Sequence, residues 1–157
     1  MEASSRLRVG IAVFVATAGI AAALALPGST LAQSPGGNRV PVNVMIVQTS
    51  NQKGAVDPRA QELHEKLKKQ LRYKSMRVIQ EQRVDLEMNR VGTVDLPDGR
   101  KVRMRPLHKG AKGLLMAVDV QGAVKLDARA PNHHKVVIGA GEYENGNLAV
   151  SIEPDYE

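Results

Sequence analysis

The segment Val40-Pro41-Val42-Asn43-Val44-Met45-Ile46-Val47 decides how the rest of the chain is arranged. Its apolar side chains at Val42, Val44 and Ile46 recur at every second position, which is the period of a β-strand. Met45 is apolar as well and falls on the opposite face. The strand is therefore predicted to be buried on both faces and to lie in the centre of its sheet.

One amphipathic helix is predicted after this strand. Asp57-Pro58 combines an acidic N-cap with proline at the first helical position, both typical of a helix start. The helix is expected to run over residues 58–72 and to lie on the sheet. Its apolar stripe consists of Ala60, Leu63, Leu67 and Leu71.

The remainder of the chain has the pattern of strands and turns. Strands are predicted near residues 75–81, 83–89, 91–96, 101–107, 114–120, 124–128, 136–138 and 148–152. Pro97-Asp98-Gly99-Arg100, Gln121-Gly122 and Asn145-Gly146 are typical of hairpin turns. We predict an α+β fold with a β-α-β start, then an antiparallel β-meander, with one helix packed on a sheet of seven or eight strands.

The first 32 residues have the organisation of a secretory signal peptide. Arg6 and Arg8 precede an uncharged run at 9–26, and small residues end the segment at Thr30 and Ala32. We expect cleavage between Ala32 and Gln33. The alternative is an uncleaved membrane anchor, but the run is rich in Ala and Gly and at the short edge of the ~20 residues that span a bilayer. A lipoprotein is excluded because the chain has no cysteine.

Cleavage would leave a flexible leader at residues 33–39 and a single α+β domain at 40–157. We expect this product to be periplasmic or secreted, with no stable membrane span. Its formal charge is uneven, because residues 142–157 contain acidic and no basic side chains while the whole chain carries +6. Export and the lack of aromatic platforms argue against nucleic acid. An anionic envelope component or a protein partner is expected instead; the alternative is a solvated surface that maintains solubility.

A basic stripe is the strongest candidate binding site. Lys101, Arg103 and Arg105 alternate with Val102 and Met104, so one strand face carries three cations while the other is apolar. Two further lysines, Lys109 and Lys112, extend it. The pattern predicts docking of an anionic partner. The alternative is protection of a sheet edge, because charges deter edge-to-edge aggregation.

No catalytic residue, metal site or cofactor is predicted. The histidines His108, His133 and His134 lack the spacing of metal ligands, and His64 falls on the polar helix face. The segment Gly139-Ala140-Gly141 has no helix pattern after it, as a phosphate loop requires, so its glycines are predicted to form a turn. There is no cysteine and no Gly-x-Ser-x-Gly segment.

Three segments resemble an uncharacterised group of small exported bacterial proteins. They are residues 44–50, residues 94–100 and the ending at 137–148, within a likeness that spans most of residues 40–152. A weaker likeness is to the small β-α-β modules of envelope secretion channels. The first resemblance implies a periplasmic or secreted location and supplies no activity. We therefore expect an exported, non-enzymatic binding or accessory protein of the bacterial envelope. The alternative is a small periplasmic hydrolase or metal-dependent enzyme whose site is built from loops.

Overall fold

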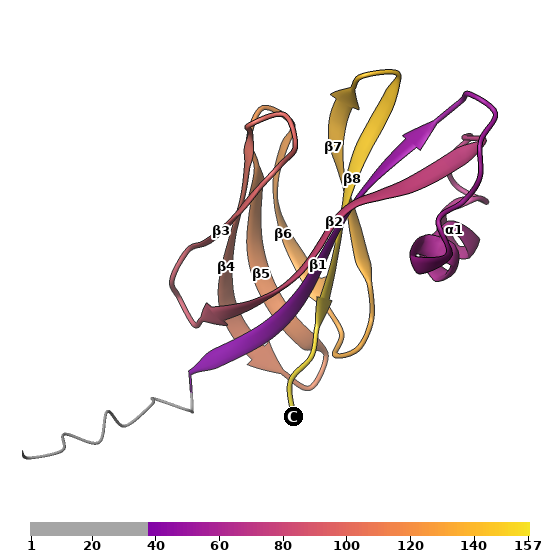
Figure 1. Cartoon of the computed structure of the whole chain (residues 1–157). Coiled ribbons are helices and arrows are strands. Elements are labelled where there is room, and N and C mark those ends of the chain that lie inside the picture. The colour runs from indigo at the N-terminus through magenta and orange to yellow at the C-terminus, as the bar shows by residue number, and fades with distance from the viewer. Residues whose placement is uncertain (1–37) are drawn as a thin grey trace, which may run out of the picture. The chain divides into compact units, whose positions relative to one another are not determined.

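A computed structural model describes residues 38–157, which form two antiparallel sheets and a short helix (Figure 1). Sheet A has the strand order β2-β1-β8-β7, and sheet B has the order β3-β4-β5-β6. The predicted signal peptide, its cleavage site at Ala32 and Gln33, and residues 33–37 of the leader lie outside the described residues. The elements are β1 (Arg39–Ser50), η1 (Pro58–Ala60), α1 (Gln61–Leu67), β2 (Ser75–Glu87), β3 (Gly92–Asp95), β4 (Lys101–Gly110), β5 (Gly113–Val120), β6 (Val124–Ala130), β7 (Val136–Tyr143) and β8 (Gly146–Pro154).

The predicted central position of β1 is confirmed. It pairs with β2 on one side and with β8 on the other. Val44 and Ile46 belong to the core between the two sheets, whereas Met45 and Val47 belong to a second apolar cluster with α1. Both faces of β1 are covered because sheet A lies between sheet B and α1 (Figure 1).

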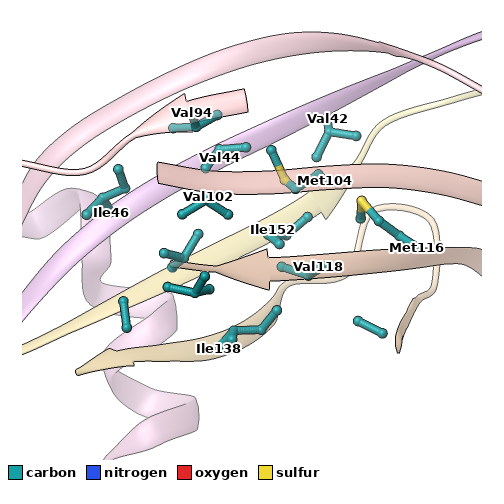
Figure 2. Packing of buried hydrophobic residues seen from close by; sticks show 14 of the residues in the cluster. Val42, Val44, Ile46, Val94, Val102, Met104, Met116, Val118, Ile138 and Ile152 are labelled. Carbon is teal, nitrogen blue, oxygen red and sulfur yellow. The ribbon is translucent and has the colours of Figure 1, made fainter. Parts of the chain in front are cut away.

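The expectation of one sheet of seven or eight strands is corrected, since the eight strands divide into two sheets of four. The cause lies in the two kinds of strand. β1 is apolar on both faces, whereas β4 and β5 alternate and have one apolar face each. Those single faces are buried when the two sheets stack. Figure 2 shows the result, with Val44 and Ile152 of sheet A beside Val102 and Val118 of sheet B.

The connection from β1 to β2 differs from the predicted layout in two ways. β1 and β2 are adjacent and antiparallel, so α1 lies in the connection of a long hairpin rather than in a crossover between separated strands. β2 is also one continuous strand, where two were predicted at 75–81 and 83–89. Gln82, the one residue between those two segments, stays in the strand because it pairs with Val44 of β1.

The helix begins where predicted but ends early. The Asp57 carboxylate accepts a hydrogen bond from the Arg59 amide at 3.0 Å, which confirms the N-cap. α1 ends at Leu67 rather than near Arg72, and Leu71 is 48% exposed instead of buried. The Lys74 amide donates to the Ser50 carbonyl at 2.8 Å, and β2 begins at the next residue. The chain must therefore turn back to the sheet, whereas each further helical residue would advance it by ~1.5 Å along the helix axis.

The hairpins at residues 97–100 and 121–122 are confirmed, and Gly99 and Gly122 have positive φ there. The third hairpin is tighter than predicted, because Tyr143 pairs with Gly146 and the positive φ falls on Glu144. The prediction of turn glycines at residues 139–141 is wrong. These residues lie within edge strand β7, where the register shift between Gly139 and Gly141 marks a β-bulge.

Candidate functional site

The first three residues of the basic stripe lie on the outer face of sheet B. Lys101, Arg103 and Arg105 of β4 are exposed there, while Val102 and Met104 point into the core. β4 pairs with β3 over Lys101–Met104 and with β5 along most of its length. Lys101 and Arg103 are therefore not on a sheet edge, and edge protection does not account for them.

Two of these three cations have acidic neighbours. The Lys101 ammonium lies 2.5 Å from the Asp95 carboxylate, and the nearest Arg103 and Asp119 atoms lie 3.9 Å apart. Within residues 38–157, no carboxylate lies within 4.0 Å of the Arg105 guanidinium. The outer face of sheet B thus carries charges of both signs, and a hollow of about 450 Å³ borders Arg105 and Ala117. Arg129 of β6, on the same face, also has no carboxylate of residues 38–157 within 4.0 Å.

The remaining two residues of the predicted site do not continue this row. A register shift between Pro106 and His108 turns Lys109 to the side opposite Arg105. Its ammonium lies 4.8 Å from the centroid of the Tyr156 ring, where it contacts the C-terminal segment. Lys112 lies in the turn between β4 and β5.

A hollow of about 990 Å³ lies on sheet A, and we call it the α1–β7 groove. One wall is the end of α1 with the segment that follows it, and the floor is the outer face of β7 and β8. The sequence did not point to this site, because its two sides are far apart in the chain. Its lining includes Asn51, Glu65, Lys66, Leu67, Lys69, Gln70, Leu71, Arg72, Tyr73, Lys135, Val137, Gly139, Gly141, Asn145, Asn147 and Ala149.

The floor of the groove is open where glycine occupies position 139. Val137, Gly139 and Gly141 line it from β7. A Cβ added at Gly139 would have no atom within 4 Å, so the space above this residue is open. Leu71 stands exposed at the wall. The floor therefore offers an apolar surface to which another chain could approach closely.

An ionic network ties α1 to the beginning of β7. Lys135, just before β7, contacts the Glu62 carboxylate and lies 3.7 Å from that of Glu153, while Lys66 lies 3.0 Å from Glu62. Hydrogen bonds from Lys135 and then Lys66 lower the pKa of Glu62 to about 2. The cations Lys66 and Lys135 are therefore already compensated inside the molecule.

Two other cations of the groove form no close ion pair. Within the described part of the chain, no carboxylate lies within 4.0 Å of Lys69 or Arg72. The one acidic lining residue, Glu65, pairs with Lys68. The wall formed by the segment after α1 is consequently positive.

Four side-chain amides also line the groove. They are exposed, and none of them makes a hydrogen bond to another group within residues 38–157. Each offers both donors and an acceptor to an incoming molecule. These residues are Asn51, Gln70, Asn145 and Asn147.

Tyr73 and His64 brace the wall of the groove from behind. The Tyr73 hydroxyl lies 3.0 Å from Nδ1 of His64, and the two rings meet edge to face at 5.4 Å. Burial raises the pKa of Tyr73. His64 is thus half-buried against Tyr73, and this contact holds the segment after α1 in place.

The other histidines are dispersed. Nδ1 of His133 lies 3.3 Å from the Asp155 carboxylate, and Nδ1 of His134 lies 2.8 Å from the Asn132 carbonyl oxygen. His108 lies on β4. Residues 38–157 contain no group of three or more His, Cys, Asp or Glu side chains that could hold a metal ion.

Arg100 joins the two sheets at the bulge of β7. Its guanidinium donates to the Ala140 carbonyl at 2.7 Å and to the Gln121 carbonyl at 3.2 Å, and it pairs with the Asp98 carboxylate. A Cβ at Gly141 would lie 3.7 Å from it. The sequence predicted only a turn at Arg100, because no local pattern reveals a partner 40 residues away.

The comparisons leave the family of this chain open. No family model, no curated protein and no solved structure matches it. Among residues 38–157, no helix is long and apolar enough to cross a membrane.

Proposed function

We propose that this chain is an exported, non-enzymatic binding or accessory protein of the bacterial envelope, and that it holds its partner in the α1–β7 groove. The observation that carries the proposal is the open floor of this groove. Gly139 leaves space above an edge strand, and Leu71 stands exposed beside it. A hollow of about 990 Å³ falls in the size range of ligand sites.

The chemistry of the groove supports binding rather than catalysis. A general acid or base works best when its pKa lies near the operating pH. The carboxylates at the groove, Glu62 and Glu65, have lowered pKa values because lysines donate hydrogen bonds to them. The rival proposal is a small periplasmic hydrolase or metal-dependent enzyme, which would need a convergent pair of titratable groups in another loop cluster.

Export is supported by the signal-peptide pattern of residues 1–32. A location in the periplasm or outside the cell would bring the groove into contact with envelope components. The absence of cysteine suits an oxidising compartment, because folding there would not depend on thiol chemistry.

Site-specific photo-crosslinking tests the proposal. The full chain, produced in a bacterium that exports it, would carry benzoylphenylalanine in place of Leu71 at the wall of the groove or, as the matched control, in place of Thr93 on the outer face of sheet B. Both positions are exposed, and the probe at position 71 leaves the space above Gly139 open. We expect higher-mass adducts at position 71 and none at 93. Equal adducts at both positions, or none at 71, would overturn the proposal.

A further inference from the structure

We infer that the occupant of the α1–β7 groove is an extended, acidic peptide segment of a partner protein. This inference rests on the proposed function and adds the chemical class of the partner. It follows from three properties of the groove, and one class of ligand must match all of them. These properties are positive charge without a close ion pair, free amide groups and an open apolar floor.

The charge of the groove selects an acidic ligand. Lys69 and Arg72 lie on its wall with no carboxylate of residues 38–157 within 4.0 Å, whereas Lys66 and Lys135 are paired with Glu62. Two free cations on one wall attract carboxylates, and the arginine can bind one through two parallel hydrogen bonds. A basic ligand would meet repulsion at this wall.

The free amides indicate that the ligand is a peptide. A peptide main chain presents one N–H donor and one carbonyl acceptor at nearly every residue. Asn145 and Asn147 at the floor side, with Asn51 and Gln70 on the other side, offer both kinds of group to such a chain. The acyl chains of a phospholipid offer no partner to these amides.

The floor favours an extended conformation. A main chain can approach closely over Gly139, and it would place alternate side chains toward Val137 and Leu71. The β7 residues from Val137 to Gly141 span roughly 13 Å at ~3.3 Å per residue. A segment of a few extended residues, with acidic and apolar side chains alternating, therefore matches the groove.

A display experiment tests this inference while the partner is still unidentified. A random octapeptide library would be selected in parallel on the full chain and on Gly139→Trp, whose indole would fill the groove. We expect peptides enriched only on the wild-type chain to alternate acidic and apolar residues. Synthetic versions would then be titrated by fluorescence anisotropy against Lys69→Glu/Arg72→Glu. We expect their affinity to fall at least about tenfold, as the loss of two charge-assisted contacts implies.

The double variant Lys101→Glu/Arg103→Glu is the matched control, because it makes the same charge change on sheet B and should bind as the wild type does. If the groove-dependent peptides are neutral or basic, or ignore the reversal at Lys69 and Arg72, the inference fails while the proposed function stands. It also fails if no peptide depends on the groove but crosslinks at position 71 capture a lipid or a glycan. If neither peptides nor crosslinks appear, the proposed function itself fails.

Discussion

The outer faces of the two sheets are built in opposite ways. On sheet B, alternating strands expose charged side chains such as Lys101 and Asp95, and no other element of residues 38–157 covers them. On sheet A, β1 presents Met45 and Val47 on the same outer side, and α1 must cover them. A sheet face with polar side chains can stay exposed to solvent, whereas an apolar sheet face must be covered by another element.

The second layer over sheet A is too short to cover it. α1 contains seven residues and packs over apolar side chains of β1, β2 and β8, such as Met76 and Ala149. The outer face of β7 therefore stays open, and it carries glycine where other strands carry side chains. The groove is thus a direct consequence of a short helix on a wide sheet.

The largest expected change in the free energy of unfolding comes from a charge placed on the buried outer face of sheet A rather than on the exposed outer face of sheet B. Val47 is fully buried beneath α1, whereas Thr93 is exposed on sheet B. Val47→Asp should lower the free energy of unfolding by about 3–5 kcal/mol, because it buries a carboxylate without a partner. Thr93→Asp should change it by less than about 0.5 kcal/mol. Urea unfolding of both variants measures the contrast, and equal losses would mean that α1 does not seal sheet A.

Loss of the Arg100 contact between the two sheets should give the next largest change in the free energy of unfolding. Arg100→Ala removes the donor to the Ala140 carbonyl and leaves Asp98 without its partner. We expect a loss of about 1–3 kcal/mol, the cost of an unsatisfied polar group in a partly buried site. Arg90→Ala, which removes an exposed pair with Glu87, is the control and should cost less than about 0.5 kcal/mol. Similar losses in both variants would show that Arg100 does not hold the sheets together.

The ionic network at the end of the groove should give a smaller, pH-dependent effect. The pKa of Glu62 is lowered from 4.5 to about 2 by Lys135 and Lys66, so its ionised form stabilises the folded state. That stabilisation is present above pH 4.5 and is lost as the pH falls through about 2. Because Glu62 is exposed, we expect at most about 1 kcal/mol between the wild type and Glu62→Gln at pH 7.

Urea unfolding from pH 7 to about pH 2 measures this difference, with Glu87→Gln as the control for removal of an exposed ion pair at the end of β2. The gap between the wild type and Glu62→Gln should close toward the acidic end of this range. A gap that stays constant throughout would show that Lys135 and Lys66 do not hold the charge of Glu62.

Charge reversal in the basic stripe is expected to have the smallest effect on stability and on peptide binding. Reversal of Lys101, Arg103 and Arg105 to Glu should change stability by less than about 0.5 kcal/mol for each exposed position. Groove-dependent peptides should bind this variant with unchanged affinity in the anisotropy titration. A loss of affinity that is large at low salt and small at high salt would instead place the docking site on sheet B, as the stripe first predicted.

The strand pattern was largely predictable, but the groove was not. Alternation at residues 101–107 and 114–120 identified strands whose inner faces are buried in the structure, and Asp98-Gly99 identified a hairpin. These features depend on neighbours within a few residues. The groove brings Leu71 and Gly139 together across 68 positions, and no periodicity links two such distant segments.

Three features follow from the order of side chains alone: β1 is buried on both faces, a capped helix begins after Asp57, and cations line one face of β4. Each depends on residues close together in the chain. The packing of distant segments sets three others: the strands divide into two sheets, α1 ends at Leu67, and Arg100 reaches β7. The reason is physical: local patterns specify which faces must leave water, whereas the partner that covers each face is chosen by packing across the whole chain.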